Sequence, residues 1–272
     1  MAIQWPLVIF SLFAGCGGAT LAFAGLSEIL GVGAKARVPA ALCSLVLLVA
    51  GGCASVLHLG QPANIMAAAT NIFSFSGISV ELILLGLNVI VGIVYLVVKR
   101  GENDGAAKAV GIVGIVTGLA MAFAVGNGYV MMAQPLWDTA ALPLGYLGSG
   151  LAMGGTLFLS LMVLREVEEA GIRKVVPFVL AATIIQAIAF LAYGFAVAFA
   201  VDALLFWGGV VLVGSVGAII SVALTPRMPN LAYAALICTL IGGVCFRALM
   251  WLVGSGYLDL FGAAGAHRLL GM

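Results

Sequence analysis

Eight long apolar segments dominate this sequence, and they restrict the chain to one class of fold. Each reaches the length of about 20 residues that an α-helix needs to cross the hydrocarbon core of a bilayer. Hydrophobic residues make up 64% of the chain and charged residues 8%, a composition that would leave large apolar patches on a water-soluble globule. The sequence therefore predicts an all-α, polytopic membrane protein with eight transmembrane helices. They are expected at approximately residues 5–32, 39–58, 77–98, 109–132, 143–164, 175–198, 204–224 and 231–253.

Short polar connections separate these segments. They include "GAKARVP", "KRGENDG", "REVEEAGIRK" and "TPRMPN", which carry the Gly, Pro and charged residues typical of loops. A membrane β-barrel is excluded because its strands alternate apolar and polar residues, whereas these runs are continuous. The 37 glycines are interpreted as sites where helix backbones pack closely. We interpret residues 1–272 as a single integral membrane domain, whose first apolar run is a span because no positive charge precedes it, unlike in a signal peptide.

The basic residues predict the orientation of the chain. Lys and Arg are retained on the cytoplasmic side of a membrane, and here only Arg268 lies on the side opposite to the other loop bases. Both termini are therefore expected on the outer side. The nine bases in the four connections of the cytoplasmic side are Lys35, Arg37, Lys99, Arg100, Lys108, Arg165, Arg173, Lys174 and Arg227.

The charge balance and the cysteines exclude other functions. The chain has eleven Lys and Arg residues and ten Asp and Glu residues, and no tract is rich in Lys and Arg. No nucleic-acid partner is therefore expected. The cysteines lie within apolar runs and lack C-x-x-C spacing, which favours small packing residues over disulfides or metal ligands. No metal site is predicted. The five cysteines are Cys16, Cys43, Cys53, Cys238 and Cys245.

Few ionisable residues remain in or near the spans: Glu28, His58, Glu81 and Arg247. A charge at the centre of a spanning helix costs about 2.5–3.5 kcal/mol of free energy, so each of these residues is expected to have a structural or functional role. Glu28 lies near the cytoplasmic end of its helix, where a solvated or salt-bridged residue is expected. The other three fall on the outer side, on three different helices, which predicts one polar pocket open toward the outer face. The alternative is a structural network in which Arg247 keeps Glu81 ionised.

A pocket on one side of the membrane favours a lipid-soluble substrate over transport, because the inner half of the bundle nearly lacks titratable groups. A quinol is such a substrate, and its oxidation releases two protons with two electrons. His58 and Glu81 could accept these protons and hydrogen-bond the ring oxygens. A partner would have to take the electrons, because the chain has only His58 and His267 for the four axial ligands of two b-type haems and lacks the cysteine spacing of iron–sulfur sites.

Four motifs resemble those of one family, the membrane anchor subunits of dimethyl-sulfoxide-reductase-type molybdoenzymes. They are "QWPLVIFSLFAGCGGAT" at the start, "LHLGQP" after the second span, "SGISVE" entering the third and "FRALMW" in the eighth. The resemblance covers most of the chain in topology and these motifs in detail. It implies a multi-pass subunit of the cytoplasmic (inner) membrane of a prokaryote, embedded in lipid and acting in the electron transport of anaerobic respiration.

The resemblance also implies partners and a site. The expected subunit carries no haem, metal or iron–sulfur cluster and oxidises menaquinol near the outer face. It passes electrons through a four-cluster iron–sulfur subunit to a molybdopterin catalytic subunit, which reduces dimethyl sulfoxide or another S- or N-oxide. His58 and Glu81 are carried over as the catalytic residues that bind the quinol and accept its protons. Arg247 completes the expected quinol-binding set, together with Gly60 and Pro62 of the "HLGxP" motif.

Two alternatives stay open at the level of the sequence. One is a quinone-reactive anchor of the polysulfide-reductase type. The other is a membrane transporter or scaffold without a redox role. The motifs leave open the terminal acceptor and the direction of the quinone chemistry.

Overall fold

The structure is a computed structural model that describes residues 3–57, 70, 72–101 and 103–269, with side chains as far as residue 253. Helices form nearly all of it, and no strand occurs in these ranges. Eight helices there are long and apolar enough to cross a membrane, which confirms the predicted fold class. The elements are α1 (Trp5–Leu30), α2 (Ala34–Leu57), the 3₁₀ turn η1 (Ile72–Ser74), α4 (Gly77–Arg100), α5 (Asp104–Asn127), α6 (Ala141–Leu164), α7 (Glu169–Ala196), the π-helical η2 (Leu204–Gly217), α8 (Ala218–Leu224) and α9 (Leu231–Leu269).

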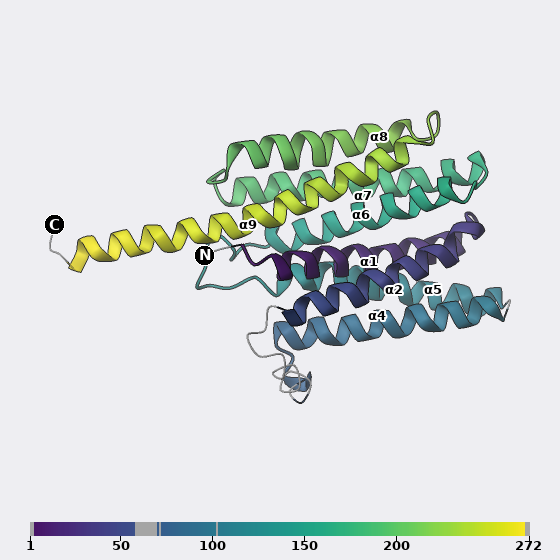
Figure 1. The fold of residues 1–272 in the computed structure, drawn as a ribbon, viewed down its shortest axis with the longest axis horizontal. Helices are drawn as coiled ribbons and strands as arrows, with labels where there is room; N and C mark the ends of the chain where they lie inside the picture. Colours follow the sequence, from purple (N-terminus) through teal and green to yellow (C-terminus); the bar gives the residue numbers. More distant parts are fainter. Residues whose placement is uncertain (1–2, 58–69, 71, 102, 270–272) are drawn as a thin grey trace.

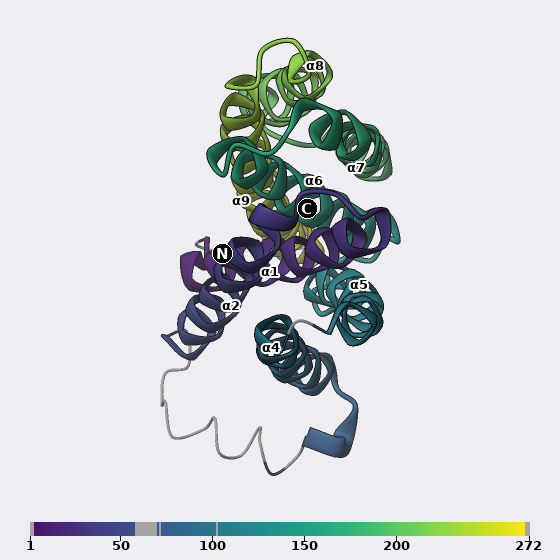
Figure 2. The same cartoon turned by 90° about the vertical axis from the view of Figure 1, so that its right-hand side faces the viewer.

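The spans run side by side and expose their connections at two ends (Figure 1). One end, here the N-terminal end, holds the N-terminus, the end of α2, the start of α4, the α5–α6 connection and the last part of α9, which projects beyond the bundle. The other, the basic end, holds the α1–α2, α4–α5, α6–α7 and α8–α9 connections. Seen along the bundle, α1 lies between α6 and α9 on one side and α4 and α5 on the other (Figure 2).

Glycines allow α1 and α5 to cross in close contact. A methyl group on Gly25 would overlap the backbone of Gly111, and one on Gly118 would overlap the backbone of Gly18. Within each helix the two glycines are seven residues apart, about two turns, so they form one stripe along the contact face. Close backbone approach of this kind is how helices pack where lipid supplies no hydrophobic driving force. The predicted packing role is confirmed at this crossing.

Three helices, α2, α5 and α7, begin five or six residues earlier than the sequence predicts. α2 starts at Ala34, before Pro39, because the Arg37 guanidinium binds the backbone oxygens of Ser27 and Val32 at 3.0 Å and so ties its first turn to the end of α1. α5 starts at Asp104 because the Asn103 side chain accepts a hydrogen bond from the Ala106 backbone N–H at 3.0 Å and caps the helix. α7 starts at Glu169 within the charged run, where an ion pair between residues one turn apart supports the exposed first turns.

α9 differs at its other end. Its membrane-spanning part starts at Leu231, as the sequence predicts, and the helix itself continues to Leu269. Glycine and polar residues follow residue 253 and end the apolar run in the sequence, which is why the prediction stopped there.

η2 widens the seventh span, because its carbonyls bond five residues ahead and not four. The Ser215 hydroxyl donates to the carbonyl of Val210, five residues earlier, at 2.9 Å. Gln186 Nε2 of α7 donates to the carbonyl of Gly214 at 2.7 Å. The freed backbone groups thus find side-chain partners, as burial in a bundle requires.

Candidate functional site

Glu81 lies just inside α4, at the N-terminal end of the bundle. The preceding residues fix the start of this helix, because the Ser76 side chain accepts a hydrogen bond from the Ser79 backbone N–H at 3.3 Å and caps it. One turn into the helix, the Glu81 side chain points toward α5 and meets Gly128, where a methyl group would overlap the carboxyl Oε1. The motif "SGISVE" therefore encodes both the cap and the placement of the carboxyl group.

Arg247 lies at the same end, fully buried in α9. Its Nε donates to the Ser11 hydroxyl at 3.0 Å, and its Nη2 to the Ser11 carbonyl at 3.2 Å. Its Nη1 donates to the Ser149 hydroxyl at 3.1 Å and to the Gly243 carbonyl at 3.0 Å. The guanidinium carbon also lies 4.5 Å from the ring centroid of Tyr146, a cation–π contact. Neutral oxygens and a ring thus compensate this buried charge.

Glu81 and Arg247 do not form an ion pair. The ion pairs within the described ranges involve Glu28, Asp104 and Glu169 as the acids. The structural network considered from the sequence, in which Arg247 directly holds Glu81 ionised, is therefore absent. The two residues share one end of the bundle, as expected, and other side chains lie between them.

Two tyrosines that contact each other connect the surroundings of Glu81 with those of Arg247. Tyr129 follows Gly128, which the Glu81 carboxyl meets, and Tyr146 lies under the Arg247 guanidinium. Tyr129, directly after α5, and Tyr146 of α6 have ring centroids 5.6 Å apart, and both interact electrostatically with the Glu81 carboxyl and the Arg247 guanidinium. The Tyr146 hydroxyl has no hydrogen-bond partner within the described residues. Burial raises the pKa of Tyr129 well above its ordinary value, so this hydroxyl is a hydrogen-bond donor at neutral pH. We call Ser11, Tyr129, Tyr146, Ser149 and Arg247 the arginine–tyrosine cluster.

The sequence interpretation missed both tyrosines. Neither is charged at neutral pH, and each merges with an apolar run, so a search for ionisable residues passes over them. A signal was nevertheless present at Tyr129, which follows the break "GNG" at the end of a span, where an amphipathic ring is typical of the membrane interface.

Three of the predicted site residues, His58, Gly60 and Pro62, lie outside the described residues. The last described residue before them is Leu57, at the N-terminal end of the bundle.

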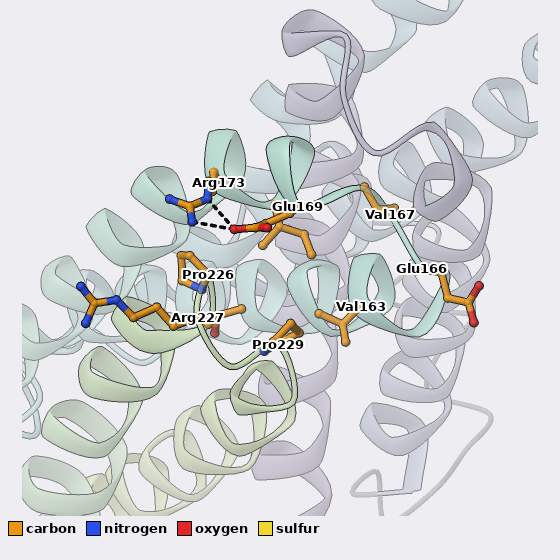
Figure 3. Close-up of a pocket in the computed structure, with 10 residues that line it drawn as sticks. Val163, Glu166, Val167, Glu169, Arg173, Pro226, Arg227 and Pro229 are labelled. Carbon is orange, nitrogen blue, oxygen red and sulfur yellow. Dashed lines mark hydrogen bonds and ion pairs between the residues drawn. The ribbon is translucent and has the colours of Figure 1, made fainter.

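Several cavities lie elsewhere in the described part of the chain. One of about 390 Å³ lies at the N-terminal end between α5 and α6, and its lining includes Asn127, Asp138 and Leu144. A larger one of about 560 Å³ lies at the basic end (Figure 3). There Arg173 and Glu169 face each other at 2.6 Å, while Arg227 comes from the α8–α9 connection. These charges lie at the opposite end of the bundle from Glu81. Glu169 and Arg173 are exposed and neutralise each other.

Glu28 forms the centre of a buried charge network at the basic end. Its Oε2 lies 2.6 Å from Arg37 Nη1, and its Oε1 lies 3.1 Å from Lys99 Nζ. Tyr95 donates its hydroxyl to the same Oε1 at 2.7 Å. The expected salt-bridged helix end is confirmed, and the network joins α1, α2 and α4.

No three His, Cys, Asp or Glu side chains in the described part of the chain lie close enough to hold a metal ion. A comparison with curated proteins gives no match. A family model described as "DMSO reductase anchor subunit (DmsC)" matches residues 1–205 of the 272, a region that includes α1 to α7 with Glu81 and both cluster tyrosines. This match and the eight apolar spans agree with the resemblance seen in the motifs, and the chain belongs to the DMSO reductase anchor subunit family.

Proposed function

We propose that this chain oxidises menaquinol at the N-terminal end of its bundle and delivers the electrons to its partners. As an anchor subunit of a DMSO-reductase-type complex, it is a multi-pass membrane protein with catalytic and iron–sulfur partner subunits. The observation that carries the proposal is the placement of Glu81: a partly buried carboxyl group with no ion pair in the described structure, beside a fixed cluster of aromatic and cationic side chains. An ionisable group in a membrane span costs free energy, and residues of this kind cluster at functional sites.

The chemistry assigns one task to each group. Menaquinol loses two protons and two electrons when it becomes menaquinone. In the proposed site, Glu81 accepts one proton and His58 the other, and each hydrogen-bonds a ring oxygen. Both electrons pass to the iron–sulfur subunit. We propose that this subunit carries four clusters and feeds a molybdopterin subunit that reduces dimethyl sulfoxide or another S- or N-oxide.

The predicted orientation adds a direction to this reaction. If the nine loop bases of the basic end face the cytoplasm, the N-terminal end faces outward. The partners would then dock over that end, close to the quinol, and protons would leave on the outer side. Arg247 contributes through the arginine–tyrosine cluster, because four hydrogen bonds hold its guanidinium to the protein.

The test uses the assembled complex with His58→Ala and Glu81→Gln. Loss of one acid–base group lowers rate by typically 10²–10⁴-fold, so oxidation of a short-chain naphthoquinol per assembled complex should collapse. Reduction of the acceptor by an artificial dye, which bypasses the membrane subunit, should stay near the wild-type rate. Equal survival of both activities in both variants would disprove the site. Loss of both together would assign these residues to assembly.

A further inference from the structure

Tyr129 connects the surroundings of Glu81 to the rest of the arginine–tyrosine cluster. The Glu81 carboxyl lies against Gly128, the residue directly before Tyr129, and the Tyr129 ring packs against Tyr146, over which the Arg247 guanidinium lies. Tyr129 is only partly buried, unlike Tyr146, which is fully buried behind it. Of the two tyrosines, Tyr129 is therefore the one that a molecule beside Glu81 could reach.

Three aromatic rings from different elements hold the Tyr129 ring in place. Its centroid lies 6.1 Å from that of Trp137 and 5.9 Å from that of Trp251, both edge to face, and 5.6 Å from that of Tyr146. Trp137 is itself fixed, because its indole N–H donates to the Met250 carbonyl at 2.8 Å. A ring clamped in this way presents its hydroxyl in a nearly fixed direction, and preorganised donors bind at a small entropic cost.

The surroundings of the hydroxyl favour its role as a donor toward a partly negative oxygen. Arg247 supplies a permanent positive charge within the cluster, where its Nε donates to the Ser11 hydroxyl and its guanidinium lies over the Tyr146 ring. A quinol oxygen gains negative charge as its proton leaves for an acceptor such as Glu81. Fixed donors and dipoles aimed at such an oxygen stabilise the charge as it develops.

We propose that Tyr129 is a quinol-binding residue. Its phenolic hydroxyl donates a hydrogen bond to the ring oxygen whose proton Glu81 accepts. This inference rests on the proposed function and adds a ligand to that site. Tyr129 keeps its own proton, so the balance of two protons and two electrons per quinol is unchanged. The substrate class follows from the same geometry: a ring with an oxygen that changes from hydroxyl to carbonyl and accepts a hydrogen bond throughout.

The test is Tyr129→Phe in the assembled complex, which removes the hydroxyl and keeps the ring contacts. Tyr193→Phe is the matched control. Tyr193 is a buried tyrosine at the same end of the bundle, and its hydroxyl donates to the Leu136 carbonyl at 3.3 Å. The KM for a short-chain naphthoquinol should rise about tenfold in Tyr129→Phe, as expected for one lost hydrogen bond. The kcat should fall as well, because the same hydrogen bond stabilises the negative charge as it develops on the quinol oxygen, and KM in the control should stay within about twofold.

Calorimetric titration of the assembled complex with the oxidised naphthoquinone gives a second readout, which does not depend on turnover. Affinity should fall in Tyr129→Phe and stay unchanged in the control. An unchanged KM and affinity in Tyr129→Phe would overturn the inference, and so would equal changes in both variants, which would mark a packing effect. If Glu81→Gln abolishes quinol turnover while Tyr129→Phe does not affect it, the inference fails alone. If Glu81→Gln retains turnover, the proposed function fails as well.

Discussion

One carboxyl oxygen of Glu81 lies against the Cα of Gly128, where α4 packs on the end of α5. Gly128 has φ −62° and ψ −18°, a right-handed helical conformation that any residue adopts. What glycine supplies here is space and not backbone freedom. The position of the Glu81 carboxyl group thus depends on the absence of a Cβ atom at Gly128.

This relationship makes Gly128→Ala a sensitive test of the site. The added methyl group would overlap Glu81 Oε1, which lies at the end of a flexible side chain and can move without disturbing the backbone. We expect normal assembly and a loss of quinol oxidation of about 10²-fold, since displacing a reacting group by about 1 Å can cost that much. The measurement is naphthoquinol oxidation normalised to assembled complex.

Gly86→Ala provides the control for this change. Gly86 lies on the same helix as Glu81, and a methyl group there would meet nothing within 4 Å. Its activity should equal that of the wild type. Wild-type turnover in Gly128→Ala would show that the carboxyl position does not matter to the reaction.

The Glu28 network should affect stability and not turnover. Glu28→Gln would leave Arg37 and Lys99 without their shared carboxylate, and removing one partner of a buried ion pair costs about 3–5 kcal/mol. We expect a lower thermal unfolding temperature of the solubilised complex, with unchanged quinol turnover per complex that assembles. Glu169→Gln breaks an exposed pair, with side chains 62% and 61% accessible, and should cost less than about 1 kcal/mol. Equal losses in the two variants would contradict the assigned role of Glu28.

The spans could be predicted from the sequence because their cause is local. A run of apolar residues must become a helix in lipid whatever surrounds it, so all eight were recognised. Depth along a helix is equally local, which is why Glu81 and Arg247 were placed at the same end and Glu28 at the other. The early start of α2 was missed because Arg37 binds the Ser27 carbonyl of α1, a tertiary contact with no trace in the residues from 34 to 39.

Pairing between helices is the part of the site that the sequence could not supply. Arg247 points toward Ser11 and Ser149 and not toward Glu81. This direction depends on how α9 is rotated about its axis when the helices pack. Tyr129 depends on the same packing, since its role comes from rings contributed by the α5–α6 connection, α6 and α9. Contacts of this kind leave no periodic pattern in the sequence from which they could be predicted.

The last prediction concerns the orientation of the bundle. Two of the nine loop bases, Arg37 and Lys99, pair with buried Glu28, but the retention of bases on the cytoplasmic side follows the number of Lys and Arg residues and not the net charge. We therefore expect the basic end in the cytoplasm and the N-terminal end outside. A phosphatase that is active only outside the cytoplasm, fused to Met272 of the full chain, should be active.

Cysteine labelling tests the same orientation at two loops. A maleimide that cannot cross the membrane should label Met132→Cys in intact cells, because Met132 is 86% exposed in the α5–α6 connection at the N-terminal end. It should label Glu166→Cys, in the α6–α7 connection at the basic end, only after the cells are opened. The reverse pattern, with an inactive fusion, would place Glu81 and the arginine–tyrosine cluster at the cytoplasmic face. The protons of the quinol would then be released inside, and the partner subunits would have to dock there, because electrons must leave from the end where the quinol binds.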